Sequence, residues 1–214
     1  MGEFSPRKAI NIPASVPRNA IAVLVSGGLQ SAILTAYLLE EFELVYPLYV
    51  QLGLPQERAE EQQLRRFLAA IRNSRLGRLA VLEKITDSSF GSREQQLLSR
   101  AANWCTENGI TSMAMATLEP CKTKDLPTEI TGSINIISPF ATISRASVLE
   151  LGRGLPLEFT FSCSRPIIKG LLVKHCGQCP KCQMRRLGLA SIHINDRTPY
   201  VAYDKAQRAV SINQ

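Results

Sequence analysis

The stretch VLVSGGLQSAIL, residues 23–34, is the feature of this sequence that most constrains the fold. An apolar, β-rich run over Ile21–Val25 breaks at Gly27 and Gly28 and then resumes with apolar residues at helical spacing over 31–41. The change of period predicts a buried strand, a glycine turn and a helix in direct succession. Such a turn can bring backbone amides close to a phosphate, although tight turns also take glycine for steric reasons alone. It has neither the Gly-Lys-Ser/Thr of a Walker loop nor the spaced glycines of a dinucleotide-binding loop, so the turn by itself does not define a ligand.

Further strands and helices alternate after this turn. The pattern predicts strands over 43–50, 79–85 and 110–117 and helices near 55–71, 94–107 and 144–151. This alternation predicts an α/β fold with a mainly parallel sheet that is covered on both faces. The glycine turn would then lie at the carboxyl edge of the sheet, where such folds bind ligands.

Two stretches of the chain depart from this regular pattern. Pro47 falls inside the second predicted strand and favours an edge position or a bulge, because proline cannot donate to a sheet. Residues 118–133 have no clear period and are predicted to form a loop.

The length and the net charge limit the possible organisation of the chain, but they do not identify its function. With 214 residues and 45% hydrophobic residues, the chain suits one α/β domain. We expect a flexible N-terminal arm (1–19), the α/β domain (20–158), a cysteine-bearing segment (159–190) and a C-terminal tail (191–214). The net charge of +7 attracts a polyanion such as ATP or RNA only if the cations cluster. No apolar run is long enough to span a membrane and the first residues lack a signal-peptide core, so we expect a cytoplasmic protein.

The sequence HCGQCPKC carries the sharpest chemical signal. It places Cys176, Cys179 and Cys182 in two successive Cys-x-x-Cys steps, with Cys163 upstream. Four thiolates at this spacing form a closed tetrahedral cage that leaves no position for a catalytic water. We therefore predict a structural zinc site, with an iron–sulfur centre and a redox dithiol as the alternatives. In a cytoplasmic chain such cysteines are metal ligands or free thiols rather than a disulfide framework.

The other candidate ligands receive simpler interpretations. Cys105 falls on the apolar face of a predicted helix and is expected to be a small core residue. Cys121 lies in the predicted loop and stays unassigned. His175 lies next to the predicted cage and is a fifth candidate ligand, although we favour an exposed loop histidine.

Several stretches resemble one family of enzymes. LVSGGLQSAIL resembles the SGGxDS loop of the N-type ATP pyrophosphatases, the PP-loop proteins, and FTFSC…HCGQCPKC resembles the QueC (ExsB-like) family of 7-cyano-7-deazaguanine synthases. YPLYVQLGLPQERAEEQQLRRFLAAI and SPFATISRASVLELGRGLPLEFTFSC are similar to further segments of that family. The resemblance covers residues 20 to 187 and implies a doubly wound, adenine nucleotide α-hydrolase-like fold with a zinc knuckle near the active site.

The resemblance also implies a reaction and its participants. A carboxylate of 7-carboxy-7-deazaguanine would be adenylated by ATP, ammonia would attack, and a second activation would dehydrate the amide to a nitrile. Ser26, Gly27, Gly28 and Ser31 would hold the pyrophosphate, and Mg²⁺ would offset its charge. Arg93 is the match to the family's Gly-Arg-Asn motif, which is present here only as GSREQQLL.

The sequence departs from the family at the expected ATP and base sites. Gln30 occupies the position where the family has aspartate, and a neutral amide does not attract Mg²⁺ as a carboxylate does. The family's Pro-Asp element is missing from LEPCKTKDLPTEI, and the chain is shorter between residues 117 and 134. Catalytic residues therefore stay unassigned, while the cysteine set is complete.

Three hypotheses follow for the function. The first is an ATP-dependent ligase that acts on a deazaguanine-like base or another carboxylate, and the second is a catalytically impaired relative that binds a nucleotide or a partner. The third is RNA recognition, which we disfavour because the cysteine segment offers cations but no aromatic residue for stacking. These cations are Lys174, Lys181, Arg185 and Arg186. The sequence does not determine whether the chain forms a homo-oligomer.

Overall fold

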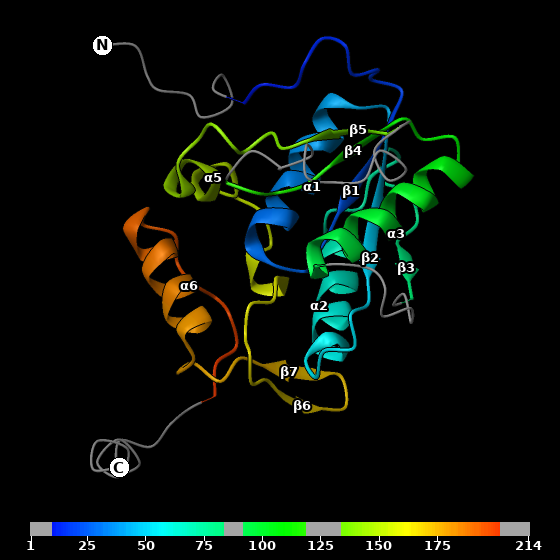
Figure 1. Cartoon of the computed structure of the whole chain (residues 1–214). Coiled ribbons are helices and arrows are strands. Elements are labelled where there is room, and N and C mark those ends of the chain that lie inside the picture. The colour runs from blue at the N-terminus through cyan, green and yellow to red at the C-terminus, as the bar shows by residue number, and fades with distance from the viewer. Residues whose placement is uncertain (1–9, 84–91, 119–133, 202–214) are drawn as a thin grey trace, which may run out of the picture.

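The computed structural model describes residues 10–83, 92–118 and 134–201. A five-stranded sheet lies at its centre, in the order β3-β2-β1-β4-β5, and all four strand pairs are parallel (Figure 1). The strands are β1 (Ala20–Leu24), β2 (Leu44–Val50), β3 (Ala80–Leu82), β4 (Ser112–Ala114) and β5 (Asn135–Ile137). The sequence pattern predicted the first four of these, with longer bounds for β3 and β4, and missed β5.

Helices cover both faces of the sheet. The helices are α1 (Leu29–Glu41), α2 (Glu57–Ala70), α3 (Arg93–Glu107), α5 (Arg145–Leu151) and α6 (Pro180–Ser191). Successive residues of β1 point to opposite faces: Ile21 and Val23 join an apolar cluster with α1, α2 and α5, whereas Ala22 joins a cluster with α3. The strand order reverses between β1 and β4, so the predicted doubly wound α/β fold is confirmed.

Local signals explain where the helices begin and end. Ser92 and Gln95 form a reciprocal cap at the start of α3: Ser92 Oγ accepts from the Gln95 amide at 3.3 Å, and the Ser92 amide donates to Gln95 Oε1 at 2.6 Å. Gly109, just past the end of α3, has a φ of +66°, which favours glycine. α5 ends at Leu151 with Gly152 as its C-cap, and Pro55 lies in the turn before α2.

Pro47 lies in an interior strand, so the prediction of an edge position or a bulge is wrong. On the β3 side of β2, Val45 exchanges backbone hydrogen bonds with Arg75 and Gly77. Pro47 is the next residue whose backbone groups face the β3 side. Pairing with β3 begins only at Leu48. The missing N–H therefore falls between two stretches of pairing and interrupts neither.

The C-terminal part adds a hairpin and α6 to this core. The hairpin pairs β6 (Ile167–Lys169) with β7 (Leu172–Lys174), and sequence periodicity did not predict it. Figure 1 shows it beside α2, where Gln62 Nε2 donates to Leu171 O at 2.7 Å.

Some predicted features lie at the margins of the described residues. In the segment predicted as an N-terminal arm, Ile12 and Val16 are buried in the first apolar cluster. Cys121 and most of the predicted loop lie outside the described residues, as does the greater part of the predicted tail. No helix in the described ranges is long and apolar enough to cross a membrane.

Candidate functional site

A cavity of about 430 Å³ opens where the strand order reverses. Its walls come from residues 24–31, which follow β1, and from residues 115–117, which follow β4. Single residues of α2 and α3, residues of α5 and α6, and Phe161 and Ser162 complete it. The carboxyl ends of neighbouring strands diverge at this point, which makes it the usual ligand site of a doubly wound sheet.

The glycine turn shapes one wall of the cavity. Gly27 has a φ of +72°, and a Cβ at this position would lie only 3.2 Å from the Glu60 carbonyl oxygen. Gly28 is the N-cap of α1 and no side chain caps the helix, so its first amides are available to a ligand. Ser31 Oγ donates to Gly28 O at 3.2 Å and accepts from the Ser26 amide at 3.2 Å, which holds the turn closed.

The structure brings most of the predicted phosphate-binding residues together. Ser26, Gly28, Gln30 and Ser31 all line the cavity, whereas Gly27 shapes the turn behind them. Arg93 is the first residue of α3, and its side chain lies outside the described part.

Four charged residues of the cavity wall were not predicted as part of this site: Glu60, Arg145, Lys181 and the buried Arg185. Arg145 is the first residue of α5 and Lys181 the second of α6, so both cations lie at helix starts that face the cavity. Glu60 comes from α2, and Tyr49 donates its hydroxyl to Glu60 Oε2 at 3.0 Å. Burial raises the pKa of Glu60, while this hydrogen bond and the charge of Lys181 act in the opposite direction. Their partners lie far away in the sequence, so no local pattern identified them.

The four predicted metal ligands form a compact cluster. The sulfur atoms of Cys163, Cys176, Cys179 and Cys182 all lie within 4.8 Å of one another, and all four side chains are buried. Cys179 Sγ and Cys182 Sγ are 3.4 Å apart. A tetrahedron with 2.3 Å bonds has sulfur–sulfur edges of about 3.8 Å, so the cluster has the donor set and the size of a metal site.

Backbone amides support the negative charge that such ligands carry. The amides of Arg165 and Cys176 donate to Cys163 Sγ at 3.3 and 3.2 Å, and the Cys179 amide donates to Cys176 Sγ at 3.3 Å. Hydrogen bonds to a thiolate favour its ionised form, which is the form that binds metal.

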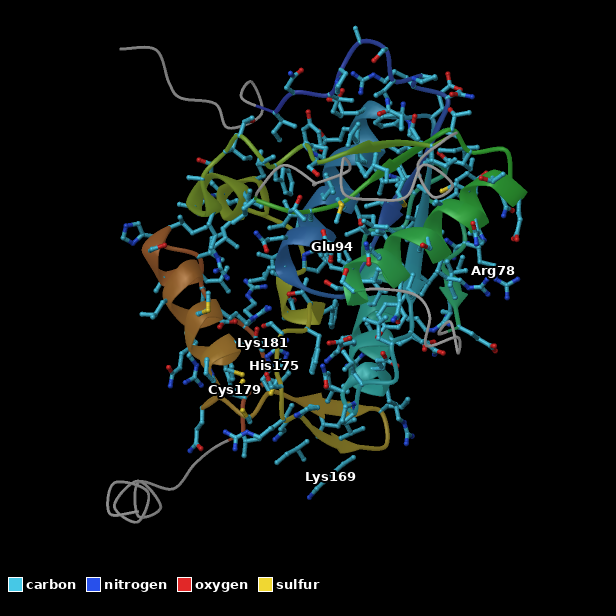
Figure 2. The ribbon with its side chains drawn as sticks, viewed as in Figure 1. Arg78, Glu94, Lys169, His175, Cys179 and Lys181 are labelled. Atoms are coloured by element: carbon cyan, nitrogen blue, oxygen red, sulfur yellow. The ribbon has the colours of Figure 1, made fainter. Side chains whose placement is uncertain are left out.

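The cysteine cluster adjoins the cavity. The Phe161 amide donates to Gly27 O at 2.6 Å, so the chain that leads to Cys163 is hydrogen-bonded to the glycine turn. Lys181 lies between the ligands Cys179 and Cys182 in sequence, and Figure 2 shows it near the start of α6. The position of this cation is therefore tied to the geometry of the cluster.

His175 is neither a fifth ligand of the cluster nor an exposed residue, so the expectation of an exposed loop histidine is wrong. Its ring is fully buried between the rings of Phe161 and Tyr200, at centroid distances of 4.9 and 5.7 Å. Burial, with a contribution from the Arg185 charge, lowers the pKa of His175 to about 3, so the ring is neutral. Cys105 is a buried core residue as predicted, and burial raises the pKa of its thiol to about 12.

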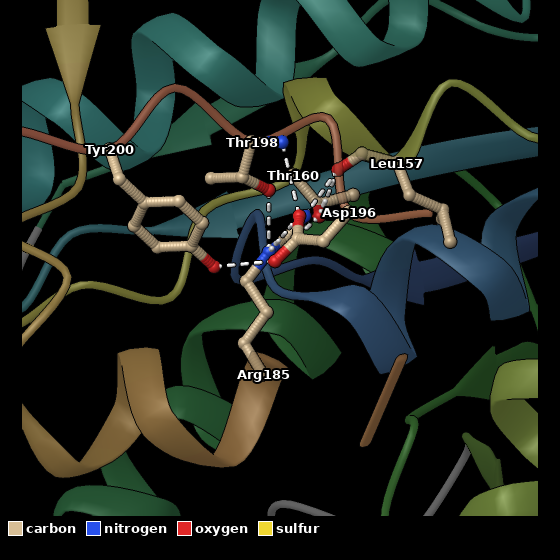
Figure 3. Close-up of polar contacts among 6 residues, drawn as sticks. All are labelled: Leu157, Thr160, Arg185, Asp196, Thr198 and Tyr200. Carbon is tan, nitrogen blue, oxygen red and sulfur yellow. Dashed lines mark hydrogen bonds and ion pairs between the residues drawn. The ribbon is translucent and has the colours of Figure 1, made fainter. Parts of the chain in front are cut away.

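Arg185 of α6 lines the cavity wall and is almost completely buried. Its Nε donates to Thr198 Oγ1 at 2.8 Å, and its terminal nitrogens donate to Thr160 Oγ1 at 2.8 Å and to Leu157 O at 2.6 Å (Figure 3). A single side chain thereby joins α6, the 3₁₀ turn Leu157–Phe159 and the segment at residues 195–201.

A carboxylate completes the surroundings of this buried cation. Asp196 Oδ1 lies 3.7 Å from Arg185 Nε, and Tyr200 donates its hydroxyl to Asp196 Oδ2 at 2.6 Å. Arg186 lies over the Tyr200 ring at 3.9 Å, which attaches the same segment to the cysteine cluster. The sequence suggested only that both arginines were cations of the cysteine segment.

The chain has a doubly wound α/β fold with a glycine turn at its switch point and a four-cysteine cluster beside it. Residues 105–193 match the family model of the queuosine biosynthesis protein QueC. Over this part the chain is QueC-like, which confirms the resemblance seen in the sequence.

Individual relatives match over limited lengths. The 7-cyano-7-deazaguanine synthase of Anaeromyxobacter dehalogenans is 36% identical over 69 residues, which cover 31% of this chain and 28% of that protein. The chain thus spans less than a third of this curated relative.

Solved structures are similar at a coarser level. The U34-tRNA thiolase NcsA from Methanococcus maripaludis, solved with its 4Fe–4S cluster, is 16% identical with a TM-score of 0.48, over 69% of this chain and 60% of that one. The NMN synthetase from Francisella tularensis is 12% identical with a TM-score of 0.45, over 92% and 84%.

Proposed function

We propose that this protein is an ATP-dependent carbon–nitrogen ligase of the QueC type. It would convert 7-carboxy-7-deazaguanine and ammonia to 7-cyano-7-deazaguanine, or act on the carboxylate of a related base. The observation that carries the proposal is the cavity at the switch point, which joins the glycine turn to three cations of the QueC-like segment. Its volume of about 430 Å³ is in the range of small-molecule sites.

The residues of the cavity suit the charges of this reaction. The substrate carboxylate attacks the α-phosphorus of ATP and pyrophosphate leaves; ammonia then displaces AMP to form the amide. A second ATP activates the amide oxygen, and loss of AMP and protons leaves the nitrile. The first amides of α1, with Ser26 and Ser31, are the proposed pyrophosphate donors, and Lys181 and Arg145 offset negative charge.

Two metals belong to the proposal. Zinc in the cysteine cluster would have four protein ligands and no free position, so its role is structural. It would fix the first turn of α6 and with it Lys181. Mg²⁺ would accompany the polyphosphate and offset its charge while it is bound and transferred.

A catalytically impaired binding module is the second candidate. The observation that favours it is Gln30, a neutral residue in the wall of the cavity. Such a protein would bind a nucleotide without turning it over.

One assay separates these two candidates. The protein is incubated with ATP, Mg²⁺, ammonia and 7-carboxy-7-deazaguanine, and AMP and the nitrile are quantified beside an active control enzyme. Formation of both supports the ligase. Nucleotide binding by calorimetry without either product supports the binding module.

Replacing Lys181 by alanine should weaken the binding of ATP and of pyrophosphate by about tenfold, which corresponds to about 1.4 kcal/mol. The reason is that the variant removes a cation from the wall of the cavity. Isothermal titration calorimetry measures the two dissociation constants.

The matched control for Lys181 is Lys169→Ala. Lys169 is exposed on the hairpin at the outer edge of the molecule (Figure 2), and we expect its variant to bind like the wild type. Equal weakening in both variants would show that general positive charge, and not this cavity, attracts the nucleotide.

A further inference from the structure

Glu60 is the only acidic side chain among the described residues that line the cavity. Its backbone packs against the glycine turn, because a Cβ on Gly27 would lie 3.2 Å from the Glu60 carbonyl oxygen. Its carboxylate accepts the Tyr49 hydroxyl at 3.0 Å, so a residue of β2 restrains its position. An oriented, half-buried carboxylate therefore lies in the same cavity as the phosphate-binding turn.

This carboxylate is electrostatically out of place in a site for an anion. The rest of the wall offers helix amides and the cations Lys181, Arg145 and Arg185, whereas a carboxylate repels a phosphate. Burial raises the pKa of Glu60, which shows that its negative charge is poorly solvated. The charge of Lys181 partly offsets it, but within the described part of the chain Glu60 forms no ion pair. A bound polyphosphate and this acid become compatible if a cation lies between them.

We propose that Glu60 binds the divalent cation that accompanies a polyphosphate in this cavity. The inference rests on the proposed function, because it requires that a nucleotide or pyrophosphate binds here. Mg²⁺ takes oxygen ligands and is commonly held by one or two carboxylates together with substrate phosphates. Glu60 supplies the carboxylate, and the Ser26 hydroxyl and the Gln30 amide add neutral oxygens in the same cavity.

The proposal also explains how the cavity tolerates Gln30. A neutral amide at this position contributes an oxygen but no charge, so the charge that attracts the cation has to come from another element. Helix α2 provides it, at a residue 30 positions further along the chain that lines the same cavity.

The test measures how strongly Mg²⁺ and the polyphosphate enhance each other's binding. Calorimetry gives the dissociation constants of ATP and of pyrophosphate with Mg²⁺ and with EDTA, for the wild type and for Glu60→Gln. We expect Mg²⁺ to tighten binding to the wild type by about tenfold or more, and to tighten binding to Glu60→Gln by less than about twofold. Electron paramagnetic resonance of Mn²⁺ in the presence of pyrophosphate reports the cation directly, without any turnover.

Two further variants make the result specific. Glu60→Asp keeps the charge and should retain part of the enhancement. Glu61→Gln removes the neighbouring acid, which pairs with Arg65 on the surface of α2 at 2.8 Å, and should behave like the wild type. Glu60→Gln is close in shape and its amide oxygen can still accept from Tyr49, so its thermal midpoint should stay near that of the wild type.

The outcomes separate the two proposals. If the wild type binds polyphosphate and Glu60→Gln keeps the full enhancement by Mg²⁺, the role of Glu60 is overturned while nucleotide binding stands. If the wild type binds neither ATP nor pyrophosphate with Mg²⁺ or EDTA, the proposed function fails and the cation site fails with it. Loss of the enhancement in Glu60→Gln together with its retention in Glu61→Gln supports the site.

Discussion

Replacing Cys182 by serine should abolish stoichiometric metal binding and strongly destabilise the C-terminal part of the protein. Cys182 is fully buried, and its sulfur lies 3.4 Å from that of Cys179, so a hydroxyl at this position leaves an incomplete cage. Metal binding to closed cysteine sites contributes about 10–16 kcal/mol in small zinc peptides, most of which appears as folding energy. Loss of only about 4 kcal/mol lowers the thermal midpoint of a chain of this size by roughly 8–16 °C.

Metal analysis and thermal unfolding with and without a chelator measure these effects. We expect about one metal ion per chain in the wild type and less than about 0.2 in the variant. The absorption spectrum separates the two metal hypotheses, because a zinc site is colourless and an iron–sulfur centre absorbs in the visible range. A Cys182→Ser protein that keeps a full complement of metal would contradict the four-cysteine site.

Cys105→Ala is the matched control for the loss of a buried thiol. Cys105 is equally buried, but it belongs to the apolar cluster around α3 and lies away from the four cysteines. Its replacement should cost about 1 kcal/mol through lost packing and leave the metal content unchanged. A drop in metal content in this variant would point to a general loss of folding in place of a lost ligand.

The sequence was informative where the physical signal is local. The change from strand period to helix period around Gly27 and Gly28 identified β1, the turn and α1, because burial of one helix face and both strand faces shapes the sequence directly. The two Cys-x-x-Cys steps likewise brought three of the four cysteines together through short turns. Residue spacing alone was sufficient in both cases.

The sequence was uninformative where a position depends on distant partners. Strand β5 has only three residues, too few to show a period, and it is defined by pairing with β4. Glu60 and Tyr49 lie on different elements, so their contact in the cavity follows from the packing of α2 against the sheet. Pro47 was misplaced for the same reason, since the gap between Leu76 and β3 that accommodates it is a property of the neighbouring strand.

The burial of Arg185 changes the role that its charge can have. In the sequence it is one of four cations near the cysteines, which is a pattern compatible with an RNA surface. In the structure it is 1% exposed and donates to Leu157, Thr160 and Thr198, so its guanidinium takes no part in a surface. This arginine therefore adds nothing to an RNA-binding surface, which is consistent with our preference for a small-molecule site.

Replacing Arg185 by methionine should reduce the free energy of unfolding by about 3–5 kcal/mol, because it removes the counter-ion of Asp196 and the guanidinium donors of three buried oxygens. Arg185→Lys should recover only part of the loss, since an ammonium does not reproduce the fork of the guanidinium. Arg197→Met is the control: it lies in the same segment and is exposed, so we expect a change below about 0.5 kcal/mol. Urea unfolding at pH 7 measures all three.

The pH dependence of the Arg185 effect tests the contribution of Asp196. Burial by itself raises the pKa of Asp196, but the hydrogen bonds from Thr198 and Tyr200 and the charge of Arg185 outweigh it, so the pKa lies below its usual value. A carboxylate with a lowered pKa contributes stability above its unfolded pKa of about 3.9, and this contribution is lost as the pH falls further. The gap between the wild type and Arg185→Met should therefore be constant from pH 7 to 5 and narrow below about pH 4. A gap that stays constant down to pH 3 would show that the neutral acceptors Leu157, Thr160 and Thr198 hold Arg185 in place and that the Asp196 charge does not.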